Sequence, residues 1–435
     1  MTDENRLTHY LVSDLGGVTR GRGGYRAGAG LASSVGWVPV NQLISPFDTI
    51  PSPNPYGSHG DCRLFPDAEA LFEAALPDRR MRFALCDVGS LDGETFTLCA
   101  RSFLKRAVDG LARHGLKVFA SFEQEFWLEL PDTGPRRPGF SYQRAISHEP
   151  FGERLLEVLT AAGLDPEMLL AEFAQDQFEL VLAPTFGVAA ADRAVASREI
   201  VRAAALSAGG SASFTPVRTP GGVGSGVHIH FSLWTEDGRP VLYDPAGPGG
   251  LSDIGAAFSA GIVRHMAALC ALTAPSVVSY ERLQPHRWSS AYTCLGDRNR
   301  EATLRICPLV GSDPESAGRQ YNLEYRAADA TANPYLALGG LLMAGLAGLD
   351  AGLSAPPLVN DDPSEADPAA MAALGVVRLP TSLDAALDAL EADAAALGWL
   401  GEDLARAYLI AKRHEAEQCR GLEADAVCAR YAEVF

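Results

Sequence analysis

Positive charge is scarce in this sequence. Across 435 residues, 36 lysines and arginines stand against 54 aspartates and glutamates, which gives a formal net charge of −18 at pH 7. Proteins that bind nucleic acid or anionic membranes in general present a basic face. We therefore expect no nucleic-acid partner and no membrane partner, although a locally basic pocket for an anionic substrate stays compatible with this charge.

Paired cysteines and long apolar runs are also missing. The eight cysteines stand singly, with no CxxC pair, which is typical of reduced thiols in the cytoplasm and not of a disulfide scaffold or a zinc site. The N-terminal segment MTDENRLTHY lacks the apolar core of a secretory signal. The most apolar window, residues 335–352, is short and rich in glycine and alanine, which favours a buried helix over a membrane span. We expect a cytoplasmic protein.

The chain is long enough for two or three domains with a sizeable core. Before residue 92, short apolar runs alternate with glycine and proline clusters, a pattern typical of strands and turns. From Arg101 onward the apolar spacing becomes helical. We expect a small β-rich domain over residues 1–96 and a large α+β domain over residues 97–435.

Periodicity also predicts the main elements of the large domain. The pattern indicates strands at residues 117–130 and 172–182, loops at 140–150 and 361–369, and helices at 153–162, 192–208, 254–272 and 333–350. A last helical region is expected to begin at Thr381, with that threonine as the N-cap and Asp384 three residues on.

The stretch TPGGVGSGVHIHFSLW, residues 219–234, joins a glycine-rich loop to an alternating run. In the run, His228 and His230 fall on one face of a predicted strand, and apolar residues fall on the other. Two imidazoles on one face, next to a loop whose backbone can approach a ligand, suggest a metal or phosphate site. The alternative is an ordinary strand with two surface histidines after a glycine turn.

Three segments of the large domain place carboxylates inside apolar strands. They are SFEQEFWLEL with Glu123 and Glu125, AEFAQDQFELVL with Glu172 and Glu179, and YNLEYRAADA with Glu324. Such carboxylates are costly to bury unless a cation or a hydrogen-bond network compensates them. Oxygen ligands with one imidazole favour Mg²⁺ or Mn²⁺ over zinc. Ordinary edge-strand acids are the alternative, and it weakens because all three segments fall in one domain.

Arginines gather in the region that follows. Guanidinium groups bind carboxylates and phosphates in bidentate fashion and stabilise charge on a transferring phosphoryl group. An arginine-rich stretch alone is most often surface or a subunit contact. Beside a carboxylate metal site, and without a GxxxxGK[ST] loop or a GxSxG elbow, it favours phosphoryl transfer from a Mg²⁺-nucleotide by an enzyme without a P-loop. The arginines are Arg282, Arg287, Arg298, Arg300, Arg305, Arg319 and Arg326.

Six ordered motifs resemble those of the glutamine synthetase family: FEQEFWL, EFAQDQFEL, GSGVHIHFS, SYERLQP, DRNREATLRICP and EYRAADATANPYLAL. The resemblance implies an N-terminal β-grasp domain and a large C-terminal catalytic domain, built as an antiparallel sheet flanked by helices. It also implies a homo-oligomer of stacked rings, a dodecamer or a decamer, with active sites between neighbouring subunits.

The same resemblance implies ATP as co-substrate and two or more divalent cations, Mg²⁺ or Mn²⁺, in each site. By position, Glu125, Glu172 and Glu179 would hold the cation that faces the acid substrate. Glu123, His228 and Glu324 would hold the cation that bridges the nucleotide phosphates. In the family reaction ATP phosphorylates a side-chain carboxylate, and an amine then attacks the acyl phosphate.

Other positions match residues that contact the substrates of the family. Arg300 matches the arginine that steadies the transferred γ-phosphate, and Arg282 and Arg326 match the pair that grips the substrate carboxylate. Gly224 matches a backbone contact to the amino acid. The positions that match nucleotide contacts are His230, Ser232 and Arg305.

Two loops depart from the family pattern. The NGSG loop reads Val223-Gly224-Ser225-Gly226, so the asparagine that contacts glutamate is absent, and the PGxE flap reads Pro285-His286-Arg287-Trp288. Trp288 thus replaces the glutamate that helps to hold ammonium. An aromatic ring there can contact an apolar or cationic amine, unless these residues simply pack and the carboxylate comes from elsewhere. A lysine expected after the arginine-bearing strand has no equivalent near Asp313.

We therefore expect a carbon–nitrogen ligase that joins the γ-carboxylate of glutamate, or of a related acid, to an amine larger than ammonia. The candidates are the polyamine, ethanolamine, alkylamine and anilide branches of the family. Two rivals stay open: glutamine synthetase itself, using ammonium, and a non-catalytic ring-forming relative. The second rival predicts missing metal ligands, whereas all six ligand positions are filled here.

Overall fold

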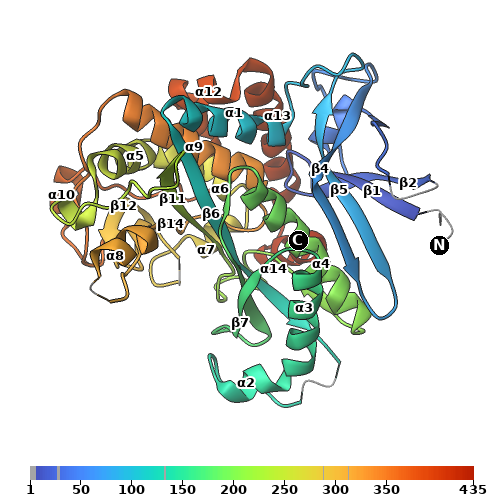
Figure 1. Cartoon of the computed structure of the whole chain (residues 1–435), viewed down its shortest axis with the longest axis horizontal. Helices are drawn as coiled ribbons and strands as arrows, with labels where there is room; N and C mark the ends of the chain where they lie inside the picture. Colours follow the sequence, from blue (N-terminus) through green and yellow to red (C-terminus); the bar gives the residue numbers. More distant parts are fainter. Residues whose placement is uncertain (1–5, 27–29, 132–133, 288, 312) are drawn as a thin grey trace.

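The computed structural model describes residues 6–26, 30–131, 134–287, 289–311 and 313–435. It contains two β-sheets, one formed by the N-terminal part of the chain and one by the rest (Figure 1). The N-terminal strands, blue in Figure 1, lie at one side of the molecule, where β4 contacts α3 and α4 of the large domain. The predicted α+β class, with a small N-terminal sheet domain and a large catalytic domain, is confirmed.

The N-terminal sheet has five strands in the order β2-β1-β5-β4-β3. The pairing of β1 with β5 is parallel and the other pairings are antiparallel. Tyr10, Leu64 and Val88 form part of the core on one face of this sheet. The elements are β1 (Arg6–Ser13), β2 (Thr19–Arg26), β3 (Val35–Trp37), the 3-10 helix η1 (Pro39–Leu43), β4 (Cys62–Ala75) and β5 (Arg80–Gly89).

The second sheet has nine strands and carries the predicted ligands. Its main path runs β12-β13-β14-β11-β6-β8-β7, and β9 and β10 both pair with β6. The sheet is antiparallel as expected, except that β12 and β13 run parallel. Its strands are β6 (Leu116–Glu129), β7 (Pro166–Ala171), β8 (Gln177–Leu182), β9 (Thr185–Phe186), β10 (Ser211–Ser213), β11 (Val227–Thr235), β12 (Tyr292–Asp297), β13 (Ala302–Ile306) and β14 (Leu323–Tyr325).

Helices α1 (Ala100–Arg113), α4 (Ala189–Ser207), α5 (Asp253–Arg264) and α9 (Pro334–Asp350) form the layer that packs against this sheet. Helix α9 is the buried helix that the apolar window predicts, and the Asn333 side chain caps its start. Gly348 of α9 and Gly261 of α5 allow the two helices to approach closely, because a Cβ on either would lie 2.0 Å from a backbone oxygen of the facing helix. The glycine-rich composition of α9 thus serves helix packing.

Three predictions for the large domain are wrong in detail. The single helix at 254–272 is two helices, α5 and α6 (Met266–Thr273), which meet at His265 with a bend of 74°. The loop at 140–150 contains α2 (Tyr142–Ser147) and the start of α3 (Glu149–Ala161). The strand predicted at 172–182 begins only at Gln177, because residues 172–176 form the turn between β7 and β8, with Asp176 at φ 60°.

The C-terminal part is helical as expected, with a shifted start. Ser382, and not Thr381, caps α11, because the Ser382 hydroxyl accepts a hydrogen bond of 3.1 Å from the amide of Ala385. The remaining elements are η2 (Pro248–Gly250), α7 (Ser279–Arg282), α8 (Pro314–Gln320), α10 (Pro368–Ala373), which begins inside the predicted loop at 361–369, α11 (Leu383–Ala392), α12 (Ala394–Leu400), α13 (Glu402–Cys419) and α14 (Ala424–Val434).

Among the described residues, no single helix is long and apolar enough to cross a membrane. Taken together, the bent pair α5 and α6 meets the length and composition required. Most residues of both helices are buried within the protein core.

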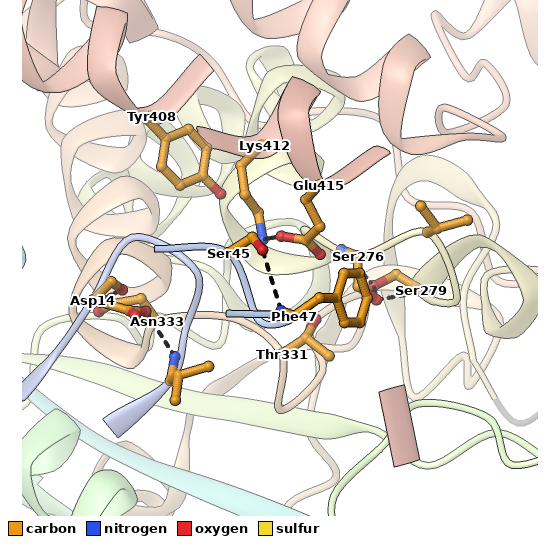
Figure 2. A network of polar contacts seen from close by, with 12 residues as sticks. Asp14, Ser45, Phe47, Ser276, Ser279, Thr331, Asn333, Tyr408, Lys412 and Glu415 are labelled. Carbon is orange, nitrogen blue, oxygen red and sulfur yellow. Dashed lines mark hydrogen bonds and ion pairs between the residues drawn. The ribbon is translucent and has the colours of Figure 1, made fainter. Parts of the chain in front are cut away.

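A buried polar network joins the N-terminal domain to the catalytic domain. Figure 2 shows Asp14 and Ser45 on N-terminal loops, close to Lys412 and Glu415 of α13. Asn333 donates hydrogen bonds to the carbonyl oxygens of Ser13 (3.1 Å) and Asp14 (3.0 Å). These bonds fix the loop after β1 against the start of α9. Ser45 (3.2 Å to Gln418) and Thr49 (2.9 Å to His414) fix the loop after η1 against α13.

Asp14 makes the stability of this junction depend on pH. Burial raises its pKa to about 6, even though Arg20 Nε lies 2.5 Å from its Oδ2. In an unfolded chain the pKa is about 3.9, so the folded state binds this proton more tightly. The resulting contribution to stability is complete below pH about 4 and is lost as the pH rises through about 6.

We expect the Asp14→Asn variant to lose this titration. The free energy of unfolding of the native protein, minus that of the variant, should fall by about 2 kcal/mol between pH 4 and pH 7. Urea unfolding of both proteins at several pH values measures the difference. A difference that stays constant over this range would contradict the raised pKa.

Candidate active site

Strand register brings the predicted ligands to one face of the second sheet. The pairing of β6 with β11 sets Glu123 opposite His228, and the pairing of β6 with β8 sets Glu125 opposite Glu179. The pairing of β11 with β14 adds Glu324. Because each strand places alternate residues on the same face, side chains that are far apart in the sequence converge here.

Glu123, His228 and Glu324 form one group of possible ligands. His228 Nδ1 lies 3.5 Å from Glu123 Oε2 and 3.5 Å from Glu324 Oε1, and one ligand atom from each residue lies within 4.8 Å of the others. Although burial opposes ionisation, His228 and Arg326 hold the pKa of Glu324 at about 2. This group coincides with one of the two predicted cation sites.

Glu125 and Glu179 form a second group together with His228, again within 4.8 Å. Burial raises the pKa of Glu125 to about 7 and that of Glu179 to about 9, and neighbouring carboxylates add to both shifts. Gly226 N (3.0 Å) and Gln177 Nε2 (2.8 Å) donate to Glu125 Oε2. Carboxylates this close ionise together only when a cation compensates their charge.

The donor set fits a divalent metal ion. His228 Nε2 is buried and has no hydrogen-bond partner among the described residues, as expected of an imidazole nitrogen that is reserved for a ligand. The other donors are carboxylate oxygens, which Mg²⁺ and Mn²⁺ prefer.

Glu172, the remaining predicted ligand, does not join either group. It lies on the turn between β7 and β8, and its Oε2 accepts a hydrogen bond of 3.2 Å from the amide of Phe173. Its charge nevertheless contributes to the raised pKa values of Glu125 and Glu179. Glu172 therefore borders the carboxylate group.

The predicted nucleotide residues lie at the β14 end of this face. His230 Nε2 lies 3.2 Å from Glu123 Oε2, and Arg305 Nη1 lies 2.7 Å from Glu324 Oε2. The Ser232 hydroxyl accepts a hydrogen bond of 2.9 Å from Trp234 Nε1. Arg305 and His230 therefore already contact the predicted metal ligands.

Sequence reasoning missed two residues that touch His230. Asn322 Oδ1 lies 2.9 Å from His230 Nδ1, and Cys307 Sγ lies 3.7 Å from the same atom. Cys307 follows Arg305 by two residues, so the strand alternation that was applied to Glu123 and Glu125 could have identified it. Asn322 precedes β14 and has no such signal.

Two of the predicted substrate arginines are buried and fixed by the backbone. Arg282 Nη2 donates to the Arg326 carbonyl (3.0 Å), and Arg326 Nε donates to the Arg300 carbonyl (3.1 Å). A Cβ on Gly224 would lie 2.7 Å from Arg282 Cγ, and one on Gly226 would lie 2.2 Å from Arg282 Nη2. The glycines of the loop are therefore needed for its close approach to Arg282.

The flap is tied to two other loops. Arg287 Nη1 donates to the carbonyl oxygens of Gly221 and Gly222, the latter at 2.9 Å. His286 Nε2 lies 2.7 Å from Asp362 Oδ2, and His286 adopts φ 59°, a conformation that glycine adopts more readily. The predicted amine contact Trp288 lies outside the described residues.

A buried arginine that the sequence did not indicate organises the Glu172 turn. Arg144 on α2 is 1% exposed and donates to the carbonyl oxygens of Glu172 (2.6 Å), Ala174 and Arg137. A Cβ on Gly139 would lie 2.7 Å from the Phe173 carbonyl oxygen. The segment before α2 and the Glu172 turn are therefore packed together around one guanidinium group.

We expect Arg144→Met to destabilise the protein by about 1–3 kcal/mol, because it leaves buried carbonyl groups without donors. Urea unfolding measures this change. Arg154→Met is the matched control, since Arg154 on α3 is largely exposed and pairs with the exposed Glu157 at 3.6 Å. Its effect should stay within about 0.5 kcal/mol. Equal effects of the two substitutions would show that the carbonyl contacts contribute nothing.

Comparison with known proteins extends the geometric findings. Residues 97–431 match the family model for the glutamine synthetase catalytic domain, and residues 1–88 match the model for the glutamine synthetase N-terminal domain. The chain is 36% identical over 413 residues to the gamma-glutamylpolyamine synthetase GlnA3 of Streptomyces coelicolor, covering 93% of this chain and 87% of that protein. It is 35% identical over 311 residues to the glutamine synthetase of Thermococcus kodakarensis, covering 69% and 67%.

Two solved structures share the fold along nearly the whole chain. One is a crystal structure of a novel glutamine synthase homolog, with a TM-score of 0.90, 41% identity and coverage of 100% of both chains. The other is ligand-free GmaS, with a TM-score of 0.80, 26% identity and coverage of 97% of this chain and 95% of that one.

Proposed function

Because this chain belongs to the glutamine synthetase family, we propose that it is an ATP-dependent ligase that joins the γ-carboxylate of glutamate, or of a related acid, to an amine larger than ammonia. The observation that carries the ligase assignment is the shared face of Glu123, Glu125, Glu179, His228 and Glu324. We assign residues 1–96 to the N-terminal domain and residues 97–435 to the catalytic domain.

The same face suggests how charge is managed during the reaction. Glu123, His228 and Glu324 would hold one divalent cation, and Glu125 and Glu179, with Glu172 beside them, would hold another; we propose Mg²⁺ or Mn²⁺. Bound cations supply charge stabilisation to the transferring phosphoryl group.

The arginines and the nucleotide residues would position both substrates. Arg282 and Arg326 hold the carboxylate of the acid. Because both side chains are already fixed, little conformational entropy is lost in ordering them when the acid binds. Arg300, which is exposed, is free to reach the γ-phosphate and to stabilise its charge in the transition state. The proposed nucleotide contacts are His230, Ser232 and Arg305, and Gly224 offers its backbone to the acid.

The amine preference rests on two residues and on the relatives. Val223 and Trp288 replace the asparagine and the glutamate that the family uses for glutamate and for ammonium. A tryptophan removes a carboxylate from the ammonium pocket and offers a ring face to an alkylammonium group. Because GlnA3 is named a gamma-glutamylpolyamine synthetase, polyamines are the first amines to test.

The test incubates the purified protein with Mg²⁺, ATP and glutamate and a panel of ammonium, polyamines, ethanolamine, methylamine and aniline. Phosphate release gives the rate, and mass spectrometry identifies the amide. We expect at least one organic amine to exceed ammonium. A rate with ammonium that matches every organic amine would instead establish a glutamine synthetase. If no amine releases phosphate, a panel of acids replaces glutamate, because Val223 changes the contact to the acid.

We also propose that the chains assemble as stacked rings of ten or twelve, with each active site between neighbouring subunits. Family membership is the support for this assembly. A non-catalytic ring-forming role is disfavoured because the described part of the chain retains the carboxylates and the histidine of the ligand face.

A further inference from the structure

A cavity of about 240 Å³ lies on the face of the sheet opposite the carboxylates. Phe126 on β6 and Phe178 on β8 line it, and each directly neighbours a site carboxylate, Glu125 or Glu179. Since successive side chains of a strand point to opposite faces, the cavity and the active site are separated by the sheet. Helices α2 and α3 form the other wall, with Tyr142, Ile146 and Leu156.

One buried polar side chain lines this apolar cavity. His148 is 5% exposed, and its Nδ1 lies 3.1 Å from the Arg144 carbonyl oxygen. A carbonyl oxygen can only accept, and the Ser147 hydroxyl, 3.0 Å from Nδ1, donates its own proton to the same carbonyl at 2.8 Å. Nδ1 is therefore the donor, and Nε2 of the neutral ring is an acceptor. Nε2 is buried and has no hydrogen-bond partner in the described part of the chain, although buried polar groups are normally paired. A ligand in this cavity that donates a hydrogen bond would therefore give His148 Nε2 the partner that it lacks.

Charge restricts the ligand further. The charged residues that line the cavity are Glu149 and Glu153, both exposed at its rim, and no described lining residue is a lysine or an arginine. The chain as a whole carries a net charge of −18. An anion is therefore repelled, whereas an ammonium group is attracted to the rim.

We propose that this cavity is a second ligand site, which binds a hydrophobic primary amine. The apolar part of the ligand packs against Phe126 and Phe178, and its nitrogen donates to His148 Nε2 while facing Glu149 and Glu153. An apolar cavity of about 150 Å³ holds benzene, so 240 Å³ admits one ring with a short side chain. This site is separate from the proposed ligase site and does not depend on that activity.

Isothermal titration calorimetry with 2-phenylethylamine, without ATP or metal, tests the proposal on the full chain. We expect one site per chain, weaker binding of the neutral 2-phenylethanol and no binding of the anion phenylacetate. Failure of 2-phenylethylamine to bind, or tighter binding of phenylacetate, would overturn the proposal.

Three variants locate the bound molecule. Ala145→Phe blocks the cavity from an exposed lining position, and Gln143→Phe adds the same ring to an exposed position on α2 that does not line it. We expect the first to weaken binding at least about tenfold, a loss of one good contact, and the second to leave it unchanged. His148→Phe should also weaken amine binding about tenfold by removing the acceptor. If the His148→Phe variant does not fold, Ala145→Phe alone tests whether the amine occupies the cavity.

Glu125→Ala separates this site from the active site. The substitution alters only the opposite face of the sheet, so 2-phenylethylamine should bind this variant as it binds the native protein. Loss of binding in Glu125→Ala, or binding that survives Ala145→Phe, would place the amine in the active site and overturn the proposal. Neither outcome depends on which amine the ligase uses.

Discussion

Glu125→Ala is expected to lower turnover by at least about 10²–10³-fold, the loss typical when one preorganised electrostatic group is removed from an active site. Glu125 lies opposite Glu179 in the sheet and within 4.8 Å of Glu179 and His228. Its Oε2 also accepts hydrogen bonds from Gly226 N and Gln177 Nε2. The substitution therefore removes a proposed cation ligand and releases the glycine loop that borders Arg282.

Steady-state phosphate release with the best acid and amine measures this loss. Glu129→Ala is the matched control, because Glu129 lies on the same strand four residues on, is largely exposed and pairs with Arg218. It should retain turnover. Glu125→Gln separates the role of Glu125 as a cation ligand from its role in holding the glycine loop. Its amide oxygen still accepts a hydrogen bond from Gly226 but carries no charge. Activity retained in Glu125→Ala would refute the assignment of the ligand face.

The ligand face was predictable because it depends on the shortest periodicity in proteins. Glu123 with Glu125, and His228 with His230, stand two residues apart in apolar runs, so alternation alone places each pair on one face of a strand. Alternation within one strand does not show which strands pair with each other. The register that sets Glu123 opposite His228 is a property of the tertiary structure, and it could be predicted from the sequence only through the resemblance to a family.

Arg144, one of the residues that sequence reasoning missed, acts through backbone carbonyl groups. Arg144 donates to carbonyl oxygens on the Glu172 turn, about thirty residues away in the chain, and any residue type supplies a carbonyl. No pattern of side chains marks such acceptors. Arg287 likewise donates to the carbonyl oxygens of Gly221 and Gly222. Composition predicted that these segments beside the site are loops, but it does not show the backbone contacts that position them.

At two places the apolar periodicity of the sequence continues although the regular secondary structure does not. Apolar spacing persists across His265, yet the helix bends there because α6 must turn to pack against α9 and α11. Apolar residues likewise flank Ala174 and Gln175, yet the chain reverses there, since Arg144 gathers the carbonyls of the turn around its guanidinium group. Tertiary packing overrides local preference at both places.

The largest effect on stability is expected at the junction of the two domains. Lys412 is 0% exposed and lies 2.6 Å from Glu415 Oε2 (Figure 2). Tyr431 donates a hydrogen bond of 2.6 Å to Glu415 Oε1. Lys412→Met leaves the Glu415 carboxylate buried without its cation. Breaking a buried pair from one side costs about 3–5 kcal/mol, which urea unfolding measures directly.

Arg413→Met, one residue on, is the control, because Arg413 pairs with Asp388 and Glu391 at the protein surface and should contribute at most about 1 kcal/mol. The double variant Lys412→Met/Glu415→Leu removes both charges, so it should recover much of the stability that the single variant loses. If the double variant were as unstable as Lys412→Met alone, the loss would come from packing around the methionine. Recovery would instead show that the domain junction tolerates the absence of both charges but not the presence of one, which is the expected behaviour of an ion pair sealed between α13 and the loops that carry Asp14 and Ser45.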